Sequence, residues 1–166
     1  MARGRKVLIL DLDNTLWGGV IGDDGLEGIV LGLETAEGEA FTAFQQYIKE
    51  LANRGVVLAV CSKNDIDIAI QVFHHHSGMV LHENDITHFE VNFEDKVTNI
   101  QRIAKVLNVG LDSLVFVDDN PVERAWVEGQ LGDVLVVNLP NDPADYIMAL
   151  DELNAFCVRK ITNEDL

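Results

Sequence analysis

Apolar residues form two kinds of segment along this chain, short runs and longer stretches with helical spacing. The short runs lie at 6–10, 56–61, 89–93, 114–117 and 134–137. The unbroken ones among them are typical of strands buried on both faces of a parallel sheet. We therefore predict five strands and expect the one at 89–93 to lie at an edge.

Stretches with apolar residues at every third or fourth position separate and follow these runs. They predict helices at 39–53, 65–73, 96–107, 121–126 and 143–153. The core-facing residues expected in the second helix are Ile66, Ala69, Val72 and Phe73. Alternating strands and helices indicate repeated βαβ units, so we predict a Rossmann-like α/β fold with a parallel five-stranded sheet and helices on both faces.

The segment before the first helix is rich in glycine, with six glycines between residues 17 and 33. This composition favours tight turns. We expect residues 20–21 and 29–31 to pair as a small hairpin, forming a flap beside the end of the first strand. Trp17 is expected to pack beneath that flap.

Length and composition predict a single globular domain over residues 1–166. The sequence shows no membrane-spanning run and no secretory signal. Because it contains only Cys61 and Cys157, we expect no disulfide framework and a cytoplasmic location, with Cys157 structural. Residues 162–165 resemble a helix start, so we expect a domain cut from a longer polypeptide.

The net charge of −16 argues against nucleic acid and anionic membranes as partners. A phosphorylated substrate would need a local cation to offset this field.

Acidic residues follow two of the predicted strands, at the sheet edge where open α/β folds bind ligands. Asp11 and Asp13 come after the first strand, and Asp118 and Asp119 come after the fourth. Carboxylates so close together are costly without a cation between them, and their oxygens suit Mg²⁺. We therefore predict a Mg²⁺ site formed by Asp11, Asp13 and an acid from the pair Asp118 and Asp119.

A hydroxyl and an ammonium group are expected at the same edge, where they would bind a phosphoryl group. The candidates are Ser62, Lys63, Asn64 and Lys96. For Lys63, the alternative is that its side chain only faces solvent. Asp11 is placed to attack phosphorus as a nucleophile. Asp13 is placed to protonate the leaving oxygen and then to deprotonate water.

The stretch Asp11-Leu-Asp-Asn-Thr15 by itself also fits a strand that ends in a polar turn. Together with Ser62, Lys96 and Asp118-Asp119 it resembles, in order, the four motifs of the haloacid dehalogenase (HAD) superfamily. This resemblance implies a HAD-type fold, an aspartyl nucleophile, an acid/base two residues later and a Mg²⁺ site completed by one of the last two acids. Because the glycine-rich segment is short, we expect a small flap, no large cap and an open site.

Longer stretches narrow the resemblance to the FkbH-like subfamily. It is carried by residues 12–20, 61–65 and 117–124, by Phe73, His76, Met79 and Leu81, and by the ending 156–165. Ser77 and Phe93 depart from it, where Pro and often Trp are usual. The resemblance implies a glyceryl transferase/phosphatase that takes a three-carbon unit from 1,3-bisphosphoglycerate, or a related phosphorylated three-carbon acid. The unit is dephosphorylated and loaded onto an acyl carrier protein, with neighbouring polyketide synthase domains as further partners.

Cys61 has two interpretations. The resemblance implies a cysteine that carries the acyl group, and a nearby cation would favour the reactive thiolate. The alternative is a small apolar residue of the core.

Three further features also have alternatives. Asn120 and Arg124 begin the helix after the fourth strand, where they either bind an anion or act as a cap and a surface arginine. His74–His76 form either a metal site or a polar helix end, and Asn92 is a candidate to orient Lys96. For the whole protein, the alternatives are a plain HAD phosphatase acting on a free phosphate ester or phosphoprotein, and a non-catalytic binding scaffold.

Overall fold

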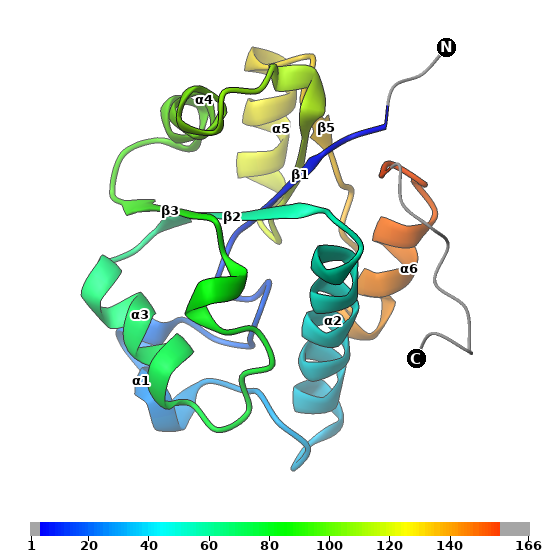
Figure 1. Ribbon diagram of the computed structural model, residues 1–166. Coiled ribbons are helices and arrows are strands. Elements are labelled where there is room, and N and C mark those ends of the chain that lie inside the picture. The colour runs from blue at the N-terminus through cyan, green and yellow to red at the C-terminus, as the bar shows by residue number, and fades with distance from the viewer. Residues whose placement is uncertain (1–3, 157–166) are drawn as a thin grey trace.

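A parallel five-stranded sheet lies at the centre of the protein, whose computed structural model describes residues 4–156 (Figure 1). The strands are β1 (Val7–Leu10), β2 (Val57–Lys63), β3 (His88–Asn92), β4 (Leu114–Val117) and β5 (Leu135–Val136). Their order in the sheet is β3-β2-β1-β4-β5, and all four pairings are parallel. The predicted fold class and the edge position of the third strand are confirmed.

Helices cover both faces of this sheet. They are α1 (Ile21–Gly28), α2 (Ala36–Asn53), α3 (Ile66–His75), α4 (Lys96–Leu107), α5 (Pro121–Gln130) and α6 (Tyr146–Asp151). One apolar layer joins the sheet to α4 and α5, and the other joins it to the remaining four helices. Figure 1 shows α4 and α5 on one side of the sheet, opposite α2 and α3. Short 3₁₀ turns, η1 (Glu83–Asp85), η2 (Leu111–Ser113) and η3 (Pro143–Asp145), complete the connections.

The flap is helical, and the predicted hairpin is wrong. Residues 21–28 form α1, with a break at Gly25, whose φ of 70° favours glycine. The Asp24 carboxylate accepts the N–H of Val20 at 2.8 Å, which satisfies a backbone donor at the start of this helix. A single bridge between Gly18 and Val30 is all that remains of the expected pairing among the described residues. No large cap lies between β1 and α2.

Smaller differences concern helix ends. Ile66, expected in the core, is 38% exposed because it is the first residue of α3, before the turns that pack against the core. The segment 143–153 begins as the 3₁₀ turn η3, and only residues 146–151 are α-helical. Cys157 and residues 162–165 lie outside the described part of the chain. Within residues 4–156, every helix is too short or too polar to cross a membrane.

Candidate active site

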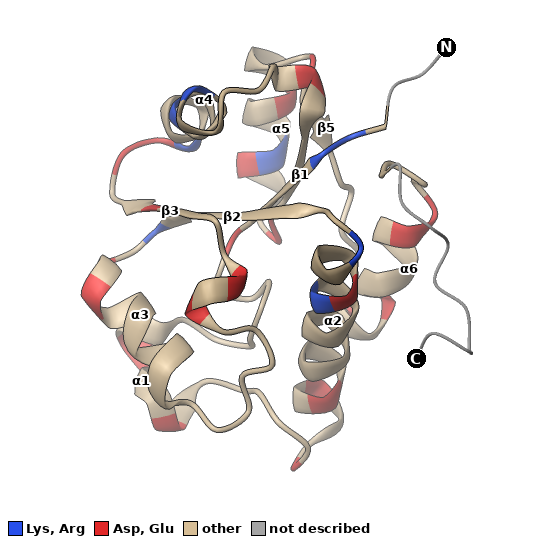
Figure 2. Ribbon diagram, in the orientation of Figure 1, with Lys and Arg blue, Asp and Glu red and all other residues tan. Residues whose placement is uncertain are grey.

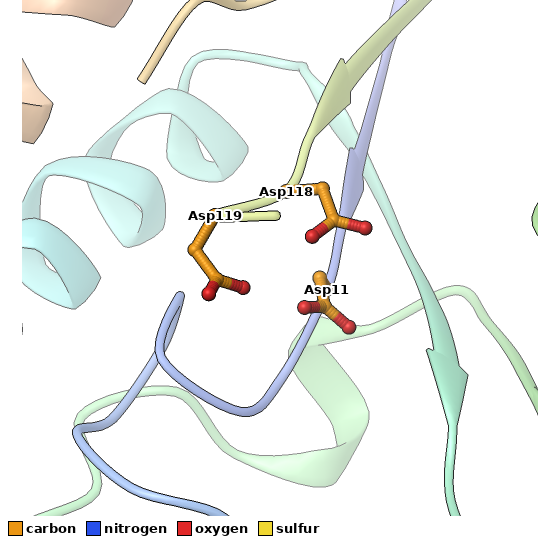
Figure 3. Close-up of side chains that lie close together, drawn as sticks. All are labelled: Asp11, Asp118 and Asp119. Carbon is orange, nitrogen blue, oxygen red and sulfur yellow. The ribbon is translucent and has the colours of Figure 1, made fainter. Parts of the chain in front are cut away.

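Three carboxylates meet at the carboxyl edge of the sheet. β1 and β4 pair in register up to Leu10 and Val117, so the residues that follow them, Asp11 and Asp118, are neighbours. Oxygen atoms of these two residues and of Asp119 lie within 4.8 Å of one another, and Figure 3 shows the three side chains converging. Carboxylate oxygens at this spacing suit a hard divalent cation. The cluster therefore fits the predicted Mg²⁺ site.

Lys96 inserts its ammonium group between two of these acids. Its Nζ atom lies 2.9 Å from Oδ1 of Asp11 and 2.8 Å from Oδ2 of Asp118. It also donates a hydrogen bond of 3.3 Å to the backbone carbonyl of Cys61. A buried ammonium requires such partners, and Lys96 is only 3% exposed. One cation facing three carboxylates leaves an excess of negative charge that a metal ion would offset.

The pKa shifts at the site follow from this burial. Burial raises the pKa of Asp11 well above its usual range, and the nearby Lys96 only partly opposes the shift. Burial also raises the pKa of Asp119, with a further contribution from the charge of Asp118. Burial alone would lower the pKa of Lys96, but the two acids that it contacts raise it above its ordinary value. Lys96 is therefore charged at neutral pH, while ionised acids are costly here without a second cation.

The carboxylate of Asp13 is not part of this cluster of three acids. Its Oδ1 accepts hydrogen bonds from Nε1 of Trp17 at 3.1 Å and from the N–H of Ile21 at 2.9 Å. Its Oδ2 accepts one from Asn64 at 2.9 Å. The chain leaves extended geometry directly after Asp13, because Asn14 has a φ of 59°. The carboxylate of Asp13 thus lies apart from the three clustered acids, while the metal-binding and acid/base roles expected for Asp13 stay predictions.

Ser62 and Asn64 lie where the sequence placed them, at the end of β2. Both are buried, and Nδ2 of Asn64 donates to Oγ of Ser62 at 2.9 Å. Lys63 points elsewhere and forms an ion pair of 2.9 Å with Glu123 at the start of α5. Its side chain is 41% exposed, so the solvent-facing alternative describes it better than substrate contact.

Asn120 and Arg124 brace the turn that carries Asp118 and Asp119. The side chain of Asn120 caps α5 by accepting the N–H of Val122 at 2.9 Å. Arg124 donates to the backbone carbonyls of Asp118 and Asp119 at 3.1 and 2.9 Å. Asn120 therefore acts as a helix cap, and the guanidinium of Arg124 stabilises the turn that carries the two acids.

The side chain of Cys61 is fully buried in the apolar layer beneath α4. Burial raises the pKa of its thiol to about 12, although the charge of Lys96 opposes the shift. The thiol is therefore protonated at neutral pH. This environment favours the core alternative over the nucleophile.

Some functional contacts were missed by the sequence interpretation. The Oγ1 atom of the fully buried Thr15 accepts the N–H of Asp119 at 3.2 Å, and the spacing of the first motif offered a signal for this. Tyr146 donates to the carbonyl of Asn14 at 2.8 Å across 132 positions, for which no local pattern exists.

Two weaker expectations have different outcomes. Within residues 4–156, the side chain of Asn92 forms hydrogen bonds with Glu90, Glu94 and Asn99 but none with Lys96. His74 forms an ion pair with Glu83. Within residues 4–156, the aspartate cluster is the one group of three or more side chains suited to a metal. His74–His76 therefore fit the alternative of a polar helix end.

Comparison with known proteins supports the fold directly. The chain is similar to the N-terminal part of the protein BF1531 from Bacteroides fragilis, which contains a phosphatase domain and is complexed with Mg, at 49% identity and a TM-score of 0.91. That match covers 95% of this chain and 42% of the other, so the chain spans less than half of this relative's structure. No protein-family model and no curated protein matches the sequence.

More distant structures share the architecture. A haloacid dehalogenase-like family hydrolase from Xanthomonas campestris is 13% identical with a TM-score of 0.57, over 92% of this chain and 97% of the other. The cobalt-bound deoxy-D-mannose-octulosonate 8-phosphate phosphatase from Haemophilus influenzae is 16% identical with a TM-score of 0.55, over 91% and 87%. The chain therefore has the fold of the HAD superfamily phosphatases.

Proposed function

We propose that this chain is a Mg²⁺-dependent phosphatase that uses Asp11 as its nucleophile. The observation that supports this most strongly is the contact between Asp11, Lys96 and the acids after β4. A scaffold that only binds a partner has no use for buried charges that are costly to keep together. The similarity to a phosphatase domain complexed with Mg supports the same activity.

The proposed reaction has two steps. The Asp11 carboxylate attacks phosphorus and forms an aspartyl phosphate, while the bond to the leaving oxygen breaks and Asp13 gives that oxygen a proton. Asp13, now ionised, takes a proton from water, which attacks the aspartyl phosphate and releases inorganic phosphate. Ser62 and Lys96 hold phosphoryl oxygens during both steps. When bound to Asp11, Asp118 and Asp119, Mg²⁺ supplies positive charge that offsets the repulsion between carboxylate and phosphate.

For the substrate, the FkbH-like resemblance leads us to propose 1,3-bisphosphoglycerate or a related three-carbon acid. The glyceryl unit would pass to an acyl carrier protein beside neighbouring polyketide synthase domains. The connection between β1 and α2 holds only the short helix α1 and no large cap, which is compatible with a partner as large as a carrier protein. The burial and raised pKa of Cys61 do not support transfer through its thiol, so direct attack by the carrier's thiol on C1, with phosphate leaving, is the better route. A phosphatase for free esters or phosphoproteins is the alternative.

The central test compares wild-type protein with Asp11→Asn. This variant keeps the shape of the side chain but loses the nucleophile, so Mg²⁺-dependent hydrolysis of p-nitrophenyl phosphate should fall by about a thousandfold or more. Near-normal hydrolysis by a correctly folded Asp11→Asn protein would refute the proposed chemistry. Intact-mass analysis of the carrier protein after incubation with 1,3-bisphosphoglycerate and Mg²⁺ then decides between glyceryl loading and the plain phosphatase.

A further inference from the structure

The carboxamide of Asn64 bridges two groups with different tasks in the proposed reaction. Its Nδ2 atom lies 2.9 Å from Oγ of Ser62 and 2.9 Å from Oδ2 of Asp13. Asn64 is 7% exposed and follows β2 directly, whereas Asp13 belongs to the turn after β1. We infer that Asn64 is a positioning residue that fixes the phosphate-binding hydroxyl and the acid/base together, an inference that rests on the proposed function.

The orientation of this amide follows from its partners. Both contacts are made through Nδ2, the donating end of the amide, with Oδ2 of Asp13 and Oγ of Ser62 as the acceptors. That group has two hydrogens, and the two contacts use both of them. Asn64 therefore has no donor left on this nitrogen for a phosphoryl oxygen, and it acts through Ser62 and Asp13 rather than on the substrate, contrary to the phosphate contact expected from sequence.

The bond to Ser62 sets the direction of its hydroxyl. Because Oγ accepts a hydrogen from Asn64, the hydrogen of Ser62 itself points elsewhere. A hydroxyl held as a donor suits a phosphoryl oxygen, which carries negative charge and accepts. Without Asn64, the hydroxyl would rotate between donor and acceptor arrangements and lose part of its affinity for phosphate.

The bond to Asp13 holds its carboxylate from the side of the sheet. Trp17 and Ile21 hold the other oxygen from the side of the flap. A carboxylate fixed at both oxygens does not rotate, which keeps it oriented for proton transfer. Loss of Asn64 should therefore reduce kcat as well as phosphate affinity, which separates positioning from simple binding.

The experiment is a double-mutant cycle on the full chain, with inorganic phosphate and Mg²⁺ as the binding probe and p-nitrophenyl phosphate for kcat. Asn64→Ala should weaken phosphate binding about tenfold and lower kcat by a similar factor. In a Ser62→Ala background the same change should weaken phosphate binding less than about threefold, because the hydroxyl that it orients is gone. The exposed Asn84→Ala is the matched control and should change neither quantity.

Equal losses of phosphate affinity in both backgrounds, or changes below about twofold, would overturn the inference, since contacting residues are expected to couple. Asn64→Asp keeps the size of the side chain and should lose as much as Asn64→Ala, so it replaces that variant if alanine prevents folding. If the wild type binds phosphate but Asp11→Asn hydrolyses p-nitrophenyl phosphate normally, the proposed function fails. The double-mutant cycle measured by phosphate binding still tests the role of Asn64 in that case. A wild type that does not bind phosphate refutes both.

Discussion

Burial decides the chemistry of individual side chains at this site. Lys96 and Cys61 lie beside each other, and both are almost inaccessible to solvent. Lys96 keeps its charge because two acids contact it, whereas the thiol of Cys61 becomes a weaker acid despite the ammonium nearby. A cation near a cysteine therefore does not suffice for a reactive thiolate when the cost of desolvation is larger.

Cys61→Ala tests this directly. It removes one buried sulfur atom, so the free energy of unfolding should fall by about 1 kcal/mol, as for small truncations in a core. Carrier loading and phosphate release should both persist, because neither uses the thiol in the route that we favour. The measurement is the mass of the carrier protein after incubation with 1,3-bisphosphoglycerate. Loss of loading with phosphatase activity retained would instead make Cys61 the acyl carrier.

At the scale of the elements, the first residues of two helices position several side chains of the site. Lys96 is the first residue of α4, and Asp95 caps this helix by accepting the N–H of Thr98 at 2.7 Å. After β4, Asn120 follows Asp118 and Asp119 directly and caps the start of α5. Capping side chains therefore fix where the helices begin, and through this the positions of the functional groups.

Asp95→Ala should lower the free energy of unfolding by about 1 kcal/mol, the usual cost of losing such a cap. It should also weaken binding of inorganic phosphate, because the first turn of α4 holds Lys96 in place. Asp142→Ala removes a comparable cap from η3 and serves as the control, with a similar loss of stability expected and unchanged phosphate affinity. Calorimetry measures both quantities. Equal effects of the two variants on phosphate affinity would show that the α4 cap has no special role.

The whole molecule carries more negative charge than its few basic residues can balance. It has 28 acidic and 12 basic residues, and Figure 2 shows acidic positions on most elements. The parallel sheet adds to this imbalance locally, because it gathers the acids after β1 and β4 at one edge. Binding of a divalent cation is therefore expected to stabilise the entire fold.

Mg²⁺ should raise the melting temperature, since it binds the folded state and has no site in the unfolded chain. At about 100 times its dissociation constant the gain in stability is about 2.7 kcal/mol. Asp118→Asn removes one of three oxygen ligands and should reduce this gain strongly, as thermal denaturation with and without EDTA would show. Identical melting curves of the wild type in Mg²⁺ and in EDTA would contradict a metal site.

The pH dependence of the metal-free protein follows from the raised pKa values of Asp11 and Asp119. Folding favours their protonated forms, so this contribution to stability is fully present below the unfolded pKa of about 4 and is lost as pH rises through the folded values. In EDTA, the wild type should therefore lose stability relative to Asp11→Asn as pH rises above about 4. Denaturant unfolding of both proteins across this range measures the difference, and a constant difference would rule out the shift at Asp11.

Much of this arrangement follows from sequence because it depends on local pattern. Unbroken apolar runs marked β1, β2 and β4, and parallel strands necessarily bring the residues that follow them to one edge. That reasoning predicted Asp11, Ser62 and Asp118 at one edge, with Lys96 at the start of the helix after β3, and the contacts of Lys96 with Asp11 and Asp118 agree with it. It failed for the flap. The many glycines there suggested a hairpin, but the segment forms a helix, at whose start the Asp24 carboxylate accepts the N–H of Val20.

Tertiary structure decided what each of these side chains touches. The Asp13 carboxylate bonds to Trp17, Ile21 and Asn64 and stays apart from the metal cluster, and no periodicity in the chain reports these partners. Packing beneath α4 determines that the Cys61 thiol is buried, while Tyr146 reaches the turn at Asn14 from the far end of the chain. Sequence pattern specifies which residues reach the sheet edge, because it reflects secondary structure. Three-dimensional packing specifies their partners and protonation, because both depend on neighbours that are distant along the chain.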